Sequence, residues 1–323
     1  MSGGCQTAVS SNLAPAVAGD RASQNPNLYS YLAGPGALVA GPAGVTIGRF
    51  AWTSPNYLDA DSSASIVNSF GGGPVAGFVM REQQGLITTY LADASMVIPG
   101  GMDVTLYTSG DFWVKNDGSG QALPGMKAYA DAATGKASFA LTGTPSTVTQ
   151  TSATITAGTA ATFTGSISGN VLTISSAVVN TLYYGALVGG ASVAAGTHIV
   201  GLLSGTKGAN GSTYSLDIGE QTVAAEAMTA TPYEANGTGG VGIVIGSTLS
   251  AVASGSATGT VLGAIVTDII TTSTSVVLAM PGAGTGTYTT GTLTFEQNIE
   301  TKWYACSSGI AGELVKISSQ PLG

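Results

Sequence analysis

The chain has 323 residues, of which only 8% are charged and 48 are glycine, and its net charge is −8 with a pI near 4.4. Nine basic residues spread over this length cannot form the positive surface that nucleic-acid binding requires. No apolar run reaches the roughly 18 residues of a membrane-spanning helix, so a membrane span is excluded as well. Abundant Thr, Val and Ile with frequent Gly instead predict an all-β protein with tight turns.

The first 27 residues are polar, rich in Gly, Ala and Ser, and interrupted by Pro15 and Pro26. Two interpretations stay open for this segment. It is a disordered terminus, or it is an extended arm that adds a strand to the sheet edge of a neighbouring subunit. The opening Met1–Gly4 has neither a basic nor an apolar region, so we expect no signal peptide.

Residues 28–143 are predicted to form one β domain. A loop and then a strand are expected over 32–52, and a mobile polar loop over 53–73, which ends in three glycines. Met102, Val104 and Leu106 alternate with polar residues, which indicates a half-buried strand, and β structure resumes at 112–114. A hairpin is expected over 127–141, with its turn at 132–135.

Four segments of the chain also resemble one known family. They read PAVAGDRASQNP (15–26), LAGPGALVAGPAGVTIGRFAW (32–52), VAGFVMREQQGLITTYLADASMVIPGGMDVTLYTSGDFWVKN (75–116) and ETKWYACSSGIAGELVKIS (300–318). They are similar to the structural cement, or capsid decoration, proteins of tailed bacteriophages. The resemblance implies a virion protein made in the host cytoplasm that binds the outer surface of an assembled head, with the major capsid protein as its partner.

The composition shifts near Thr142. Residues 144–159 are nearly all Thr, Ser, Ala, Gly and Pro, which suits a linker. An internal repeat follows with an offset of roughly 76 residues, in which Gly185–Val188 is matched with Gly263–Val266. We therefore expect two small β modules, 159–231 and 232–298, inserted into a β-barrel or sandwich domain that residues 299–323 close. Insertions are tolerated at exposed loop tips.

Few residues offer reactive chemistry. His198 is the single histidine, and its place in a β module favours a structural role over catalysis. The acidic residues lie scattered over turns and loops, so paired-carboxylate chemistry is not expected. Cys5 and Cys306 are expected to be unpaired thiols, with a bridge between the arm and the closing strand as the alternative. Packing in a thin domain is the favoured role of the aromatic residues Trp52, Phe112, Trp113, Trp303 and Tyr304, over a carbohydrate groove.

The sequence thus predicts a binding protein with no enzymatic activity, no cofactor and no metal. Arg21, Arg49 and Arg81 are the candidate capsid contacts, because arginine forks suit interface carboxylates and carbonyls, although solvated surface charge is the alternative for each. We expect a homo-oligomer, either a dimer or a trimer, that cements the shell, with weak host-surface contact through the modules. The competing hypothesis is a fibre-like or receptor-binding surface adhesin of the phage.

Overall fold

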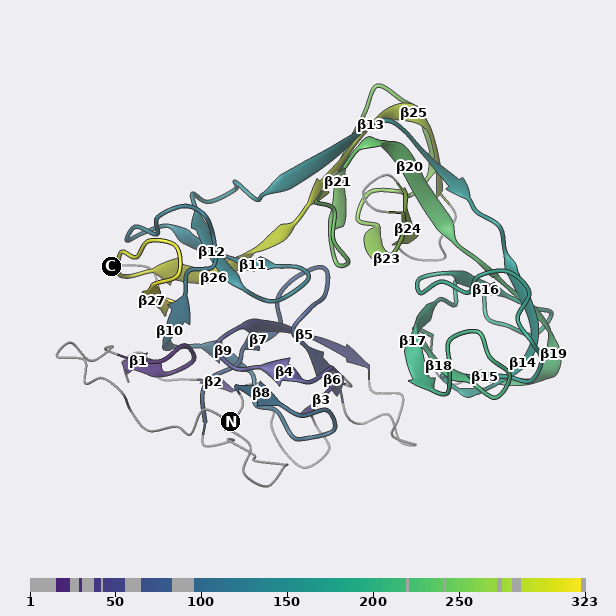
Figure 1. Cartoon of the computed structure of the whole chain (residues 1–323), viewed down its shortest axis with the longest axis horizontal. Helices are drawn as coiled ribbons and strands as arrows, with labels where there is room; N and C mark the ends of the chain where they lie inside the picture. Colours follow the sequence, from purple (N-terminus) through teal and green to yellow (C-terminus); the bar gives the residue numbers. More distant parts are fainter. Residues whose placement is uncertain are drawn as a thin grey trace, which may run out of the picture.

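The computed structural model describes residues 16–23, 29–30, 38–41, 43–55, 65–82, 96–218, 221–240, 242–271, 275–280 and 286–320. Every regular element in these ranges is a β-strand, which confirms the all-β prediction. Within the same ranges, no helix is long and apolar enough to cross a membrane. Figure 1 shows three parts: a body at the left, built from both ends of the chain, and two rounded sheets above it and to its right.

One sheet of the body, the N-terminal sheet, has the strand order β2-β9-β7-β5-β6-β3. Its strands are β2 (Tyr29–Ser30), β3 (Leu38–Ala40), β5 (Phe50–Pro55), β6 (Ser65–Asn68), β7 (Gly77–Phe78) and β9 (Tyr107–Ser109), with β4 (Val45–Thr46) and β8 (Val97–Ile98) paired beside it. The polar loop predicted over 53–73 is partly wrong, because residues 53–55 belong to β5 and residues 65–68 form β6, and the two strands pair with each other.

The predicted strand through Met102 is only partly right. Val104 and Leu106 are fully buried as the alternation indicates, but Met102 is 40% exposed. Gly101 adopts a positive φ of 81°, which places Met102 at the outer corner of a turn, and regular pairing begins only at Tyr107. Before that point, the chain pairs with β3 through the Val104 amide, which donates to the Leu38 carbonyl.

The other sheet of the body contains strands from both ends of the chain, and we call it the shared sheet. Its order is β1-β10-β27-β26-β11-β12. The strands are β1 (Arg21–Ser23), β10 (Asp111–Lys115), β11 (Lys127–Asp131), β12 (Ala137–Ala140), β26 (Asn298–Ala305) and β27 (Leu314–Ser318). β11 and β12 form the predicted hairpin, which is confirmed. The core between the two sheets is aromatic, with Phe50, Phe78, Phe112 and Trp303 in one cluster.

The upper rounded sheet, which we call barrel 2, closes on itself. The ring of pairings runs β13-β20-β24-β23-β21-β25 and returns to β13. Its strands are β13 (Thr147–Ala157), β20 (Tyr233–Gly239), β21 (Thr248–Ala253), β23 (Ile265–Thr271), β24 (Ser275–Ala279) and β25 (Gly286–Glu296), with β22 (Ala257–Gly259) added beside β25. The linker predicted over 144–159 is therefore wrong, because most of it is an 11-residue strand that completes this ring. Its many Thr and Ser side chains suit a strand with one wet face.

The right-hand rounded sheet, barrel 1, has the order β16-β19-β14-β15-β18-β17. Its strands are β14 (Ala161–Gly169), β15 (Val171–Ile174), β16 (Leu187–Gly189), β17 (Ile199–Ser204), β18 (Thr213–Leu216) and β19 (Gln221–Thr231). A bridge between Leu187 and His198 joins β16 to the start of β17 and closes the ring. If the six ring strands of each barrel are numbered along the chain, neighbouring strands follow the same order, 1-2-5-4-3-6, in both rings. In the sequence, barrel 1 is inserted between the first and second strands of barrel 2.

Backbone hydrogen bonds fix which residues of the two barrels are equivalent. The Gly185 amide donates to Ile199 O in barrel 1, and the Gly246 amide donates to Val266 O in barrel 2. Gly185 therefore corresponds to Gly246, so the predicted register, which matched Gly185 with Gly263, is wrong. The Gly-Ala motifs at 185 and 263 therefore do not mark equivalent positions, and the first strand of barrel 2, β13, lies before barrel 1 in the sequence. The division into independent domains stays a prediction.

Candidate functional site

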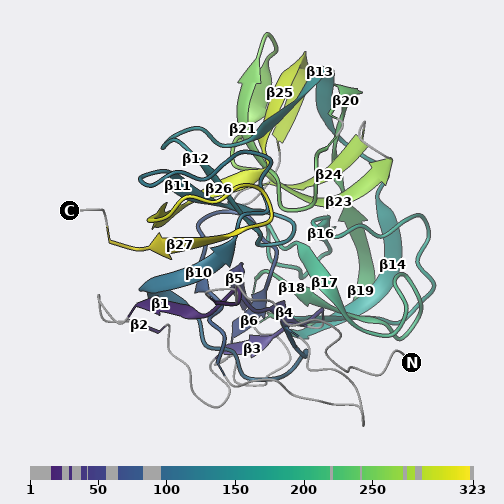
Figure 2. The ribbon, with the colours of Figure 1, turned by 60° about the vertical axis from the view of Figure 1, so that its left-hand side comes forward.

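The shared sheet turns one face toward the core and the opposite face outward. Trp113 lies directly opposite Lys316, Tyr304 opposite Ser318, and Lys127 opposite Tyr304. Cross-strand partners point to the same side of a sheet, so these five side chains share one face. We call it the outer face of the shared sheet, and Lys115, at the end of β10, extends it. Figure 2 shows β10, β27 and β26 side by side on this flank of the body.

The outer face carries aromatic and cationic side chains at intermediate exposure. Trp113, Tyr304 and Lys316 are half-buried and Lys115 is exposed. Burial of Trp303 and Phe112 on the inner face confirms core packing for these two aromatics, whereas the outer pair is only partly covered. The alternation in Asp111–Lys115 could have indicated that Trp113 faces outward. The pairing with residues 304 and 316, which brings the patch together, has no local signal.

Asp111 anchors one end of this face. The side chain is 5% exposed, accepts a hydrogen bond of 2.8 Å from the Ser23 hydroxyl, and lies 3.2 Å from Lys316 Nζ. Burial, with a contribution from the Asp111 charge, raises the pKa of the nearby Cys306 thiol. A raised pKa disfavours the reactive thiolate. Cys306 is a free cysteine, but Cys5 lies outside the described residues, so the expectation that the two thiols are unpaired stays a prediction.

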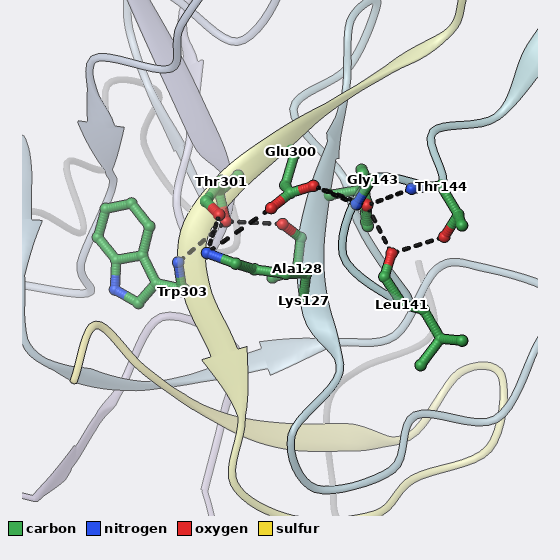
Figure 3. Close-up of polar contacts among 9 residues, drawn as sticks. Lys127, Ala128, Leu141, Gly143, Thr144, Glu300, Thr301 and Trp303 are labelled. Atoms are coloured by element: carbon green, nitrogen blue, oxygen red, sulfur yellow. Dashed lines mark hydrogen bonds and ion pairs between the residues drawn. The ribbon is translucent and has the colours of Figure 1, made fainter. Parts of the chain in front are cut away.

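A polar network fixes the place where the chain leaves the body for the barrels (Figure 3). Lys127, only 8% exposed, donates from Nζ to the Thr301 carbonyl at 3.0 Å and lies 3.8 Å from Glu300 Oε1. Glu300 Oε2 in turn accepts a 2.7 Å hydrogen bond from the Gly143 amide. The outgoing segment at Gly143 and the returning strand β26 are thereby tied together, and we call this network the root.

Tyr129 completes the root. Its hydroxyl oxygen lies 2.7 Å from Leu141 O and 3.0 Å from Glu300 Oε2, and it accepts a hydrogen bond from the Thr144 amide. Burial raises the pKa of Tyr129, while the Thr144 amide acts in the opposite direction. Removing one partner from this partly buried network leaves the other groups unpaired, which is costly where they are buried. The root therefore holds the barrels at a defined position on the body.

The three predicted arginine contacts lie in two places. Arg81 Nη1 is 3.1 Å from Asp20 Oδ1. Arg21, which follows Asp20 in the sequence, is exposed on β1. Both therefore lie at the edge of the shared sheet. Arg49 is elsewhere, where its Nη1 donates to the Thr134 carbonyl at 3.2 Å in the turn of the hairpin. Their role as capsid contacts stays a prediction.

The chain's other reactive groups do not assemble into a catalytic or metal-binding set among the described residues. His198 is buried in barrel 1, where its Nδ1 lies 2.8 Å from Asp217 Oδ2. Among the described residues, no group of three or more His, Cys, Asp or Glu side chains could hold a metal ion. Three of the scattered acidic residues, Asp59, Asp61 and Asp93, lie outside the described ranges.

A comparison with known families decides the broader identity. A family model described as the XM1 gp53 minor capsid protein matches residues 6–176, which is 171 of the 323 residues. The chain belongs to the XM1 gp53 minor capsid protein family. The match runs from the segment before β1 through the body and into the first two strands of barrel 1. No curated protein matches the chain.

Membership in this family makes the chain a phage capsid-related structural protein that is associated with the capsid and located in the virion. The aromatic and cationic outer face of the shared sheet belongs to the body, most of which lies inside the matched residues. Strands β26 and β27, which supply Tyr304 and Lys316 to that face, lie outside the match. Because this face combines aromatic and cationic side chains on the part of the chain that the family match mostly covers, it is our candidate functional site.

Proposed function

We propose that this minor capsid protein is a cement protein, which decorates the outer surface of a tailed-phage head and bridges subunits of the major capsid protein. The body binds the shell through the outer face of the shared sheet, and the two barrels project away from it. The protein acts as a homo-oligomer, a dimer or a trimer, because closed symmetric assemblies suit a lattice with two-fold and three-fold axes.

One observation carries this orientation, namely the distribution of positive charge. Eight of the nine Lys and Arg residues lie outside residues 144–298, and only Lys207 lies within them. Both barrels thus offer almost no cation to a partner, whereas the body combines lysines with Trp113 and Tyr304. Trp, Tyr and Arg are the residue types that dominate binding energy at protein interfaces. We therefore assign the capsid contact to the body, with Arg21 and Arg81 at its margin and Arg49 as a weaker candidate.

The mechanism is stabilisation by linkage. A protein that binds only the assembled shell stabilises that shell by mass action, and attachment through several copies prolongs its residence. Because the barrels carry few charges, salt should weaken binding mainly through the lysines and arginines of the body. Weak contact of the barrels with a host surface is a secondary proposal within the same orientation.

Reconstitution on heads that lack the protein tests this proposal. The wild-type chain, a Trp113→Ala variant and a Lys115→Glu variant are added to such heads, and occupancy and DNA release on heating or osmotic shock are measured. We expect wild-type protein to delay DNA release, and each variant to lower occupancy about tenfold or more, as for an interface hot spot. Val179→Ser, an exposed position in barrel 1, is the matched control and should bind normally.

Equal survival of heads with and without the protein would overturn the cement function. Equal occupancy by all variants, with folding verified by circular dichroism, would move the contact away from the outer face. The number of copies per particle separates the competing hypothesis, because a cement protein covers the lattice in hundreds of copies and a fibre-like adhesin occupies only a few sites.

A further inference from the structure

Barrel 1 is joined to barrel 2 by two short connections. β13 passes into β14 through residues 158–160, and β19 passes into β20 through Pro232 alone. The Gly158 amide donates to the Pro232 carbonyl at 2.8 Å, so the two connections run together as a narrow stalk. A two-stranded stalk restrains the angle between two folded units only weakly. Contacts outside the stalk therefore decide how barrel 1 is oriented.

The main contact outside the stalk is made by Lys207 of barrel 1. Its Nζ lies 2.8 Å from Asp268 Oδ2 of barrel 2. The same ammonium group lies 4.1 Å from the ring centre of Tyr184 and 5.8 Å from that of Tyr183, both in barrel 1. The side chains of Lys207 and Asp268 are 35% and 20% exposed, so the pair is only partly screened by solvent. The single cation within residues 144–298 is thus used to bridge the two barrels.

A second contact requires the two backbones to approach closely. Thr267 Oγ1, next to Asp268, donates a 2.8 Å hydrogen bond to the Tyr184 carbonyl. Gly185 follows Tyr184 with a φ of 78°, and a Cβ atom at this position would collide with the Thr267 side chain. The equivalent glycine of barrel 2, Gly246, faces the body in the same way, against the carbonyls of Ala132 and Gly71. Each barrel therefore meets the next unit through the same glycine turn.

The second contact borders an apolar cavity of about 460 Å³ where body, barrel 1 and barrel 2 meet. Three exposed apolar side chains line it, one from each part: Phe70 of the body, Val200 of barrel 1 and Ile245 of barrel 2. Tyr184 and Thr267 line it too, so the second contact is part of its wall. Among the residues that the structure describes, no Lys, Arg, Asp, Glu or His side chain lines this cavity. A rotation of barrel 1 away from the body would open the cavity and expose more of this apolar surface to water.

We propose that Lys207 and Asp268 form a latch that holds barrel 1 folded against barrel 2 and the body. In the latched state, the three apolar side chains line one cavity. Without the latch, barrel 1 swings on the stalk and the cavity opens. The latch gives the protein two positions for its outer barrel, and ionic strength and contacts at Asp268 select between them. This inference goes beyond the proposed function and does not depend on it.

Single-molecule FRET on the full chain tests the latch. Dyes are attached to Val179→Cys in barrel 1 and Leu123→Cys in the body, with Cys5 and Cys306 replaced by Ser. Lys207→Met and Asp268→Asn each remove one charge while keeping similar size. We expect each substitution to raise the ratio of open to closed molecules about two- to fivefold, the range for a partly exposed ion pair. The double variant should resemble either single variant.

Two controls keep the latch falsifiable. Lys115→Met removes a lysine that pairs with Asp117 at 3.4 Å within the body, and it should leave the FRET ratio unchanged. Raising the salt concentration from about 0.01 M to 1 M shortens the screening length from about 30 Å to 3 Å. It should therefore open the wild type and not the Lys207→Met variant. Identical FRET ratios in the wild type and both variants, or a salt response that persists in Lys207→Met, would overturn the proposal. If a variant unfolds, the salt response of the wild type alone decides it.

Discussion

The body and the barrels differ in the residues that form their cores and in the distance along the chain between their paired strands. In the body, the rings of Phe50, Phe78, Phe112 and Trp303 pack with centroid separations of 4.8 to 5.5 Å and join strands from the two ends of the chain. The barrels close on themselves around mostly aliphatic cores, with β13 as the one strand taken from far along the chain. The body therefore needs long-range pairing before it has a core, whereas the strands of barrel 1 all lie within residues 161–231.

This contrast predicts how the parts respond to damage at their junctions. Barrel 1 should tolerate displacement because the stalk, the proposed latch and the Thr267–Tyr184 hydrogen bond are its described links to barrel 2. Barrel 2 should not, because the root and the Gly246 contact fix it to the body.

Gly246→Ala should strongly disturb the seat of barrel 2 on the body. A Cβ atom there would lie 2.6 Å from Ala132 O and 2.9 Å from Gly71 O, and both are backbone atoms that cannot turn aside. The positive φ of 94° adds strain of about 1–2 kcal/mol. Together with overpacking of about 1–3 kcal/mol, we expect a loss of roughly 2–5 kcal/mol in the free energy of unfolding, measured by urea denaturation.

Gly263→Ala is the matched control for that substitution. Gly263 has a similar φ of 85°, but a Cβ atom there would meet nothing within 4 Å. The control therefore reports the backbone strain alone, about 1–2 kcal/mol. If the two variants lose equal stability, Gly246 is required only for its backbone conformation, and its close contact with the body contributes nothing to the free energy of unfolding.

The dependence of stability on alkaline pH distinguishes Tyr107 of the body, which is hydrogen-bonded to Glu82, from Tyr233 of barrel 2. Burial, followed by the hydrogen bond from its hydroxyl to Glu82, raises the pKa of Tyr107 to about 12. Burial alone raises the pKa of Tyr233 in barrel 2. Because the folded pKa of Tyr107 lies above the ordinary value of 10, the contribution of its neutral hydroxyl to the free energy of unfolding is fully present below pH 10. This contribution is lost as the pH rises from 10 through about 12.

Tyr107→Phe tests the coupling to Glu82. It should cost about 0.5–1.5 kcal/mol at neutral pH, the value of one hydrogen bond, and should flatten the loss of stability between about pH 10 and 12. Glu82→Gln should make that loss smaller and end it at a lower pH, because without the carboxylate the folded pKa of Tyr107 lies closer to its ordinary value of 10. Tyr233→Phe in the wild-type Glu82 background serves as the comparison. An unchanged alkaline profile in Tyr107→Phe would show that other groups control this transition.

Much of the fold could be predicted from local pattern. The all-β class, the hairpin at 127–141 and the burial of Val104 and Leu106 follow from composition, turn residues and period-two alternation. What failed depended on distant partners. Thr147–Ala157 looks like a linker because its small polar residues carry no apolar stripe, and only its pairing with β20 and β25 makes it a strand. The repeat register failed for the same reason.

The candidate site was less predictable than the fold. Arg21, Arg49 and Arg81 were chosen because charge is scarce, yet the structure ties Arg49 to the Thr134 carbonyl and pairs Arg81 with Asp20. Trp113, Tyr304 and Lys316 meet only because β10 pairs with β27 and β27 with β26, across about 200 residues of sequence. A single sequence contains no signal for such a pairing. The inserted barrels conceal it further, because they separate the two halves of the shared sheet.

Excision of barrel 1 should have the smallest effect on the remaining protein. Ala157 and Tyr233 are paired neighbours in β13 and β20, so replacing residues 158–232 by Asn-Gly turns these strands into a two-residue hairpin. Every strand of the barrel 2 ring is retained, and the root is untouched. We expect the shortened chain to unfold cooperatively with a midpoint within a few degrees of the parent, measured by calorimetry. Loss of cooperative unfolding would show that barrel 2 needs barrel 1 as a partner, and that the two barrels form one folding unit.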